Sequence, residues 1–171
     1  MNDTLLNGLD VITQSPEFFT LLTAVIILVW DAVGGKARPW VTPFLALFGL
    51  ISILLISITV REPQGTIFFG TYTQDGLSQF MKIIFIASGI FTVFASWHFI
   101  SRWSKSPGVF YAILLFAIFG MMLMVSATEL ITLFVAVETT TIALYILTAY
   151  FKEDKLSAEA GMKFIILGTV F

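Results

Sequence analysis

The sequence predicts an all-α, polytopic membrane protein with five transmembrane helices and an incomplete sixth. Of its 171 residues, 58% are hydrophobic and only 12% are charged, whereas a soluble domain carries about 25% charged residues. The mean hydropathy is +0.97. The apolar residues gather into blocks of about twenty, the length that crosses roughly 30 Å of hydrocarbon at about 1.5 Å per residue. Each block is therefore a candidate membrane span.

The first predicted span covers residues 18–33 and ends at GGKARP, where two glycines and Pro39 make a turn. A second span covers residues 40–60. The segment REPQGTIFFGTYTQDG that follows is polar and rich in turn residues. It predicts an ordered loop or a short hairpin before a third span at residues 77–99.

The turn SRWSKSPG leads into a fourth predicted span at residues 108–125, and the short junction SATE leads into a fifth at residues 130–150. After YFKEDKLS, a sixth apolar segment begins at residue 158 and still continues at Phe171. About fifteen residues of helix reach only some 22 Å. We therefore expect the chain to be the N-terminal part of a longer protein.

Polar residues predict how the last two helices begin. Ser126 or Thr128 is expected to cap the fifth span, with Glu129 complementing its positive end. Ser157 is expected to cap the sixth.

The basic residues predict the orientation of the chain in the membrane. Arg61 lies in a loop on one side, and six Lys and Arg residues fall in alternate loops on the other: Lys36, Arg38, Arg102, Lys105, Lys152 and Lys155. Loops rich in Lys and Arg stay inside. The amino terminus is therefore expected outside, and because MNDTLLNGLD lacks the basic start of a signal peptide, the first span is expected to remain.

Several kinds of soluble chemistry are not expected. The chain has no cysteine, so it holds no thiolate metal site and no iron–sulfur cluster of its own. We find no nucleotide fingerprint, phosphate loop or nucleophile elbow, and no basic patch for nucleic acid. His98, the only histidine, and Asp31 lie at the inner ends of their spans and are interpreted as interfacial or structural groups. An ion is therefore a better candidate substrate than a metabolite.

Glu138 is the main candidate for function. It lies in LFVAVETTTIALY, about nine residues from either end of the fifth span, and no basic residue stands three or four positions away. A carboxylate at that depth costs about 2.5 kcal/mol or more, so it is functional by default. Its charge partner is expected on another helix, which is the requirement for a proton relay. The alternative role is to tie helices together.

Lys163 is the second candidate for the proton relay, and three further residues, Lys82, Glu159 and Tyr145, are secondary candidates. Lys163 lies roughly 9 Å along the sixth helix and is a natural counterpart of a buried carboxylate. It faces either Glu138 or Glu159, which stands four residues earlier on its own helix. Lys82 lies five residues into the third span and is expected to snorkel to the interface. Tyr145 follows Glu138 by seven residues, on about the same helix face.

Four stretches resemble one family of membrane proteins. PEFFTLLTAVIILVWD, DGLSQFMKIIF, FYAILLFAIFGMMLMVSATELITLFVAVE and SAEAGMKFIILG together look like subunit N of the proton-pumping NADH-quinone oxidoreductases, respiratory complex I. The last two stretches also resemble subunits L and M and the multisubunit cation/proton antiporters. The PE opening and the DGLS motif favour subunit N.

The resemblance implies an antiporter-like fold of about fourteen helices built around two inverted repeats. Residues 1–106 would form the peripheral N-terminal helices 1–3, and residues 107–171 would form helices 4–5 and the start of helix 6. Glu138 matches the family's glutamate on helix 5, and Lys163 matches its lysine on helix 6. Where family members often carry an acid before FYA, this chain has Val109.

The resemblance also implies a function in a membrane-arm subunit that couples quinone reduction to proton translocation. No cofactor is expected in this chain; NADH, FMN, iron–sulfur clusters and quinone would be handled by partner subunits. The expected partners are other complex I membrane subunits and the lipid bilayer of a bacterial inner membrane, or its organellar equivalent. Two alternatives are a subunit of a multisubunit cation/proton antiporter and a structural membrane scaffold without ion transport.

Overall fold

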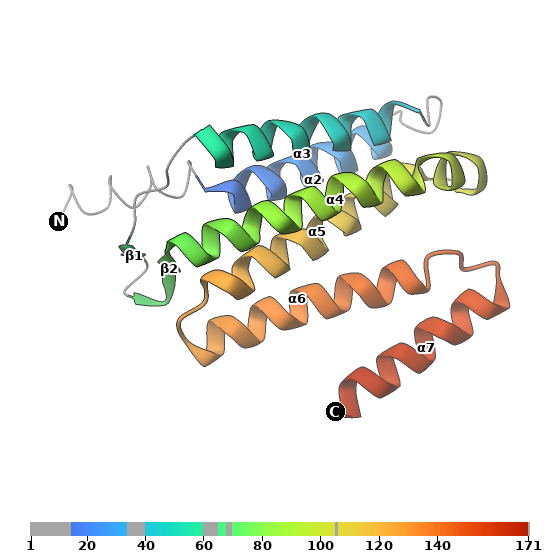
Figure 1. The fold of residues 1–171 in the computed structure, drawn as a ribbon. Helices are drawn as coiled ribbons and strands as arrows, with labels where there is room; N and C mark the ends of the chain where they lie inside the picture. Colours follow the sequence, from blue (N-terminus) through green and yellow to red (C-terminus); the bar gives the residue numbers. More distant parts are fainter. Residues whose placement is uncertain (1–14, 34–39, 60–64, 68–69, 105, 171) are drawn as a thin grey trace.

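The computed structural model describes residues 15–33, 40–59, 65–67, 70–104 and 106–170. Their order along the chain is α2 (Pro16–Val33), α3 (Val41–Thr59), β1 (Gly65–Ile67), β2 (Tyr72–Gln74), α4 (Gly76–Trp103), α5 (Pro107–Ser126), α6 (Leu130–Thr148) and α7 (Lys155–Val170). The helices α2 to α6 run side by side in alternating directions, and α7 lies at the edge (Figure 1). The two strands pair antiparallel, with Thr66 opposite Thr73.

Five of these helices, α2 to α6, are long and apolar enough to cross a membrane. The predicted all-α membrane fold with five spans is therefore confirmed, with helix ends displaced by a few residues. The segment predicted as a loop or a hairpin contains the hairpin β1–β2. The sixth helix, α7, has 16 residues and begins at Lys155 rather than at residue 158.

Helix α5 lies at the centre of the bundle, where it packs against α2, α3, α4 and α6. Its buried side chains include Tyr111, Leu115 and Ile118. They join a core that also holds Ile27 of α2 and Ile86 of α4. By contrast, α7 packs mainly on α6. Of the described helices, α7 is thus the one packed least against the rest of the bundle.

Glycine sets the close approach of α5 to α6. A Cβ atom added to Gly120 of α5 would lie 2.9 Å from the backbone nitrogen of Thr140 and 3.1 Å from the carbonyl oxygen of Ala136. Small residues let membrane helices approach closely and gain dispersion contacts. Gly120 therefore fixes which face of α6 meets the core.

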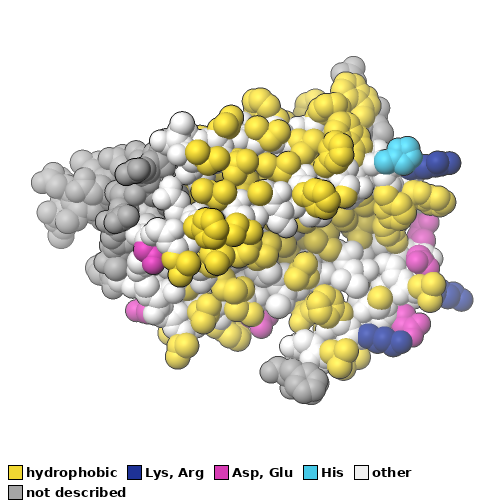
Figure 2. Space-filling model, viewed as in Figure 1, with side chains coloured by type: hydrophobic (Ala, Val, Ile, Leu, Met, Phe, Trp, Pro, Cys, Tyr) yellow, Lys and Arg dark blue, Asp and Glu magenta, His cyan; other side chains and the backbone are white. Residues whose placement is uncertain are grey.

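The bundle has two chemically different ends. At the hairpin end lie β1, β2 and the first turns of α2 and α4 (Figure 1). At the basic end lie Arg102, Lys152 and Lys155, and the Lys and Arg side chains visible in Figure 2 gather toward this end. The other basic residues used to predict orientation, Lys36, Arg38, Arg61 and Lys105, lie outside the described residues.

Helix α4 begins with a capping box. The Ser78 N–H donates to Asp75 Oδ1 at 2.7 Å, and the Asp75 N–H donates to Ser78 Oγ at 3.0 Å. These bonds satisfy amides that the helix leaves without partners. The hydrogen bond from the Ser78 backbone also lowers the pKa of the Asp75 carboxyl.

The caps predicted for α6 and α7 are wrong. The N-cap of α6 is Glu129, without a side-chain cap bond, because the Thr128 hydroxyl donates instead to the Gly70 carbonyl of the hairpin. At the start of α7, Asp154 Oδ1 accepts from the Leu156 N–H at 3.1 Å. Ser157 already lies inside α7, where its hydroxyl donates to a carbonyl of α6. The cap of α6 was thus replaced by a tertiary contact, whereas α7 begins earlier than predicted and Asp154 bonds its first turn.

Candidate functional site

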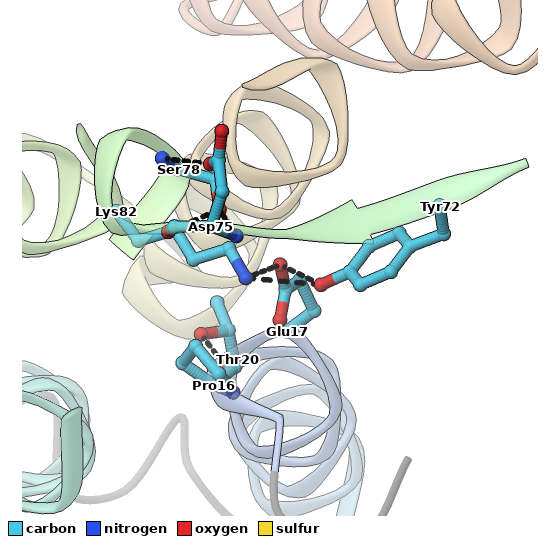
Figure 3. Close-up of polar contacts among 7 residues, drawn as sticks. All are labelled: Pro16, Glu17, Thr20, Tyr72, Asp75, Ser78 and Lys82. Atoms are coloured by element: carbon cyan, nitrogen blue, oxygen red, sulfur yellow. Dashed lines mark hydrogen bonds and ion pairs between the residues drawn. The ribbon is translucent and has the colours of Figure 1, made fainter. Parts of the chain in front are cut away.

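Three titratable side chains from three elements meet at the hairpin end: Glu17 of α2, Tyr72 of β2 and Lys82 of α4 (Figure 3). We call them the Glu17–Tyr72–Lys82 cluster. Lys82 Nζ lies 2.9 Å from Glu17 Oε1 and donates to the Tyr72 hydroxyl at 3.0 Å. The Tyr72 hydroxyl donates in turn to Glu17 Oε1 at 2.6 Å. Every pair in the cluster is therefore in direct contact.

The cluster is enclosed by the protein. Lys82 is 0% exposed, Glu17 is 4% exposed and Tyr72 is 8% exposed. The prediction that Lys82 snorkels to the interface is therefore wrong. Its ammonium points instead to the Glu17 carboxylate of α2, so its charge is paired inside the bundle.

Helical spacing explains why these residues are buried. On α4, Lys82 stands four residues after Ser78 and four before Ile86, in the stripe that faces the core. On α2, Glu17 begins a similar stripe that continues through Thr20 and Ala24. Residues three and four apart share a helix face. The core-facing side of α4 appears only once the helices pack, because its sequence is apolar around nearly the whole helix.

Sequence reasoning missed Glu17 and Tyr72 as site residues. Glu17 lies in the first turn of α2, where a helix end alone would favour an acid. Tyr72 lies on a three-residue strand, and both Tyr72 and Gln74 are buried, as expected for alternate residues of a strand. The sequence predicted a loop or a short hairpin here, but nothing in it indicated that this hairpin would pack over the ends of α2 and α4.

The environment keeps the Tyr72 hydroxyl protonated. Burial raises its pKa well above the ordinary tyrosine value, and the negative charge of Glu17 raises it further, while the Lys82 ammonium acts in the opposite direction. The hydroxyl can therefore donate to Glu17 and accept from Lys82 at the same time.

The hairpin connects the cluster to the junction between α5 and α6. Tyr72 forms an isolated antiparallel bridge with Ala127. The Thr128 N–H donates to the Thr71 carbonyl at 3.1 Å, and the Thr128 hydroxyl donates to the Gly70 carbonyl. The start of α6 is thus attached to the strand that carries Tyr72.

Glu138 lies on the outer face of α6. The buried residues of α6 are Ala136, Thr140 and Ala143, whereas Glu138 is exposed. Its side chain has no ion pair or hydrogen bond with the part of the chain that the structure describes. The partner expected on another helix is therefore not one of the described helices, and the relay role of Glu138 stays a prediction.

The other predicted site residues lie on or beside α7. Lys163 Nζ is 2.6 Å from Glu159 Oε1, and the two side chains are 69% and 58% exposed. Of the two pairings considered, the structure has the one within α7. The Tyr145 ring packs edge-on against Phe164, with ring centroids 4.9 Å apart. These contacts show where the three side chains lie but do not test what they do, so the functional roles of Lys163, Glu159 and Tyr145 stay predictions.

The basic end carries a separate polar cluster. Asp31 is 4% exposed and accepts from the Gly108 N–H at 3.2 Å, so of the two interpretations it has the structural one, joining α2 to the start of α5. His98 is exposed.

Tyr150 is the second polar residue of the basic end. Its hydroxyl donates to the Ser106 carbonyl at 2.7 Å, and burial raises the pKa of this hydroxyl. An open cavity of about 740 Å³ lies beside Tyr150. Among the described residues, no group of acids or histidines could hold a metal ion.

Comparisons with known proteins agree with one another. Residues 127–170 match the family described as "NADH:quinone oxidoreductase/Mrp antiporter, TM". NAD(P)H-quinone oxidoreductase subunit 2 of Thermosynechococcus vestitus is 35% identical over 96% of this chain and 32% of its own length. NADH-quinone oxidoreductase subunit N 1 of Solibacter usitatus is 32% identical over 95% of this chain and 34% of its own length.

The fold also matches a solved structure. A chain of respiratory complex I from Thermus thermophilus, determined with bound aureothin, aligns with a TM-score of 0.66 and 25% identity. The alignment covers 88% of this chain and 33% of that one. The chain therefore spans about a third of the length of the curated relatives and of the structure that it matches.

Proposed function

Because the chain is a relative, in sequence and in fold, of the antiporter-like membrane subunits of complex I, we propose that it forms part of a subunit that moves protons across a membrane. The energy would come from quinone reduction in partner subunits. Glu138 is the proposed proton-relay carboxylate, and Lys163 is proposed to relay protons with it.

The observation that carries this proposal is the position of Glu138. It is a single carboxylate near the middle of α6, a helix apolar enough to span a membrane, and it faces away from the central helix α5. A charge at such a depth needs a partner. The outer face of α6 therefore requires a further polar element, supplied by another part of the subunit or by a neighbouring subunit.

The proposed mechanism is electrostatic. A partner cation near Glu138 favours its charged form, and loss or displacement of that cation favours uptake of a proton. Moving a partner by a few ångströms in a site of low dielectric changes the interaction by more than one pKa unit, which is about 1.4 kcal/mol. A redox-driven change elsewhere in the complex would thereby load and unload Glu138.

We assign the chemistry of electron transfer to partner subunits. NADH, FMN, iron–sulfur clusters and quinone would be bound there, and the chain itself contains no cysteine to hold a cluster. The proposed location is a bacterial inner membrane, with the hairpin end outside and the basic end inside.

The test is Glu138→Gln in the full-length subunit of the assembled complex. Loss of a positioned proton-transfer group should slow proton translocation by about tenfold or more, with assembly unchanged. The matched control is Glu129→Gln, which changes the same residue type at the exposed start of the same helix and should leave translocation near the native rate. Full pumping by assembled Glu138→Gln complex would refute the relay.

An antiporter subunit is a second candidate, because the matching family also includes Mrp antiporters. Co-purification separates the two: a complex I subunit should be isolated with flavin and iron–sulfur proteins, and an antiporter subunit should not. A scaffold without transport is distinguished by the same Glu138→Gln variant, since its activity would then fall only in proportion to assembly.

A further inference from the structure

We propose that the Glu17–Tyr72–Lys82 cluster is a second proton-exchange site, located at the hairpin end and separate from Glu138. The ligand of this site is a proton shared with water. The inference rests on the proposed function, since proton exchange at this site contributes to translocation only in a proton-moving subunit.

The distances within the cluster allow a proton to pass from Lys82 to Glu17. Lys82 Nζ donates directly toward Glu17 Oε1 across 2.9 Å, so transfer of one proton converts an ammonium and a carboxylate into an amine and a carboxylic acid. A second route runs through Tyr72, which receives a proton from Lys82 and gives its own to Glu17. The hydroxyl is neutral before and after. When Glu17 then releases the proton to water, the cluster has lost one proton, and uptake reverses the step.

Burial makes both forms of the pair accessible. Removing charges from water favours the neutral amine and acid, whereas the attraction between the two charges favours the ion pair. At 0% and 4% exposure for Lys82 and Glu17 both effects are large. Because they oppose each other, a modest change in the surroundings can move the proton.

A structural role alone is a weak reason for this pair. Placing two charges in the interior costs several kcal/mol for each ion, and apolar residues of similar volume are often as stabilising. The hairpin is in any case attached through the backbone contacts of Thr71 and Tyr72. Ionisable groups inside membrane helices are usually functional.

Further buried polar atoms without a hydrogen-bond partner lie at the same end of the bundle. Within the described residues, the buried oxygen atoms at the hairpin end that have no hydrogen-bond partner include Glu17 Oε2, Ser57 Oγ, Gln74 Oε1 and Ser126 Oγ. Gln74 shares the buried face of β2 with Tyr72, and Ser126 precedes Ala127, which bridges Tyr72. Buried polar atoms nearly always bond to protein or to ordered water. These oxygens suit a short water chain that begins at Glu17 Oε2.

Two variants of the full-length subunit in the assembled complex test the proposal. Lys82→Arg keeps the cation beside Glu17 but does not release its proton, because the arginine pKa is above about 12. The double variant Glu17→Gln/Lys82→Gln removes both charges, so neither is left buried alone. In membrane vesicles, both should assemble and lose proton translocation by about tenfold or more. The control Lys152→Arg, at the exposed basic end, should translocate at the native rate.

The outcomes separate the two proposals. If either cluster variant assembles and translocates protons at the native rate, the cluster is structural and this inference is overturned. If the cluster variants translocate protons at the native rate but Glu138→Gln does not, the proposed function stands and only the proposal of a second site fails. If Glu138→Gln and every cluster variant pump at the native rate, the assigned relay fails as well.

Discussion

Lys82 is fully enclosed and Glu138 is exposed, although both lie in helices apolar enough to span a membrane. The difference comes from their neighbours. Lys82 shares the core stripe of α4 and meets a carboxylate from α2, so its charge is neutralised within the described chain. Glu138 occupies the face of α6 opposite α5, so its charge must be neutralised from outside. Whether a charged residue in a membrane helix is buried by protein therefore depends on the helix face that it occupies as well as on its depth in the membrane.

Tyr72 provides a residue-scale prediction with a pH dependence. Its pKa is raised above the ordinary value of about 10, so the contribution of the neutral hydroxyl to stability is fully present below pH 10 or so and is lost as the pH rises through the higher folded-state pKa. In an absorbance titration, the phenolate signal of Tyr72 is the part that the Tyr72→Phe variant lacks. This signal should appear at a higher pH than the phenolate signal of free tyrosine.

The charge of Glu17 contributes to the raised pKa of Tyr72. Glu17→Gln should therefore lower the pH at which this phenolate appears. Ionisation of Tyr72 at the ordinary tyrosine pH in the folded protein would show that the hydroxyl is not enclosed between Glu17 and Lys82.

At the scale of elements, one close helix pair determines how α6 is presented. Gly120 allows α5 to touch the backbone of α6 at Thr140, and this contact turns Glu138 outward. The hairpin holds the start of α6 through Thr128. The face of α6 is therefore set from two places, its first residues and its middle.

Gly120→Ala should destabilise the bundle by about 1–3 kcal/mol, because the new methyl group overlaps backbone atoms of α6 that cannot move without shifting the helix. The measurement is the free energy of unfolding in a detergent–lipid mixture. Gly76→Ala is the matched control, since a Cβ there meets open space in the first turn of α4, and it should leave stability unchanged or slightly higher. Equal effects of the two substitutions would show that α5 and α6 are not in close contact.

At the scale of the whole molecule, the alternating helices place the hairpin at one end and Arg102, Lys152 and Lys155 at the other (Figure 1 and Figure 2). In the proposed orientation, with the basic end inside, the hairpin end that holds the Glu17–Tyr72–Lys82 cluster lies on the outer side of the membrane. The same arrangement places Glu138 between the two ends, about 13 Å along α6 from Glu129.

Because the 171 residues contain no cysteine, single cysteines can report this orientation. Thr73→Cys at the hairpin end should react with a membrane-impermeant maleimide in intact cells. Lys152→Cys should react only in inverted membrane vesicles. The opposite pattern would reverse the proposed topology and move the cluster to the inner side.

The sequence by itself determined the helices and their order. Spans of about twenty apolar residues have few alternatives in a membrane, because every backbone amide must bond within its own segment. The resemblance carried by PEFF, DGLS and the later motifs agreed with the relatives found for the chain.

Only the tertiary structure decided which charges meet. Glu17, Tyr72 and Lys82 are brought together by a hairpin 55 residues after Glu17, and no local rule specifies such a contact. The hydroxyls of Thr128 and Ser157, both predicted to cap helices, likewise bond to carbonyls of other elements. Membrane chemistry restricts secondary structure strongly, but the pairing of buried charges depends on helix faces and contacts between distant residues, which appear only when the helices pack.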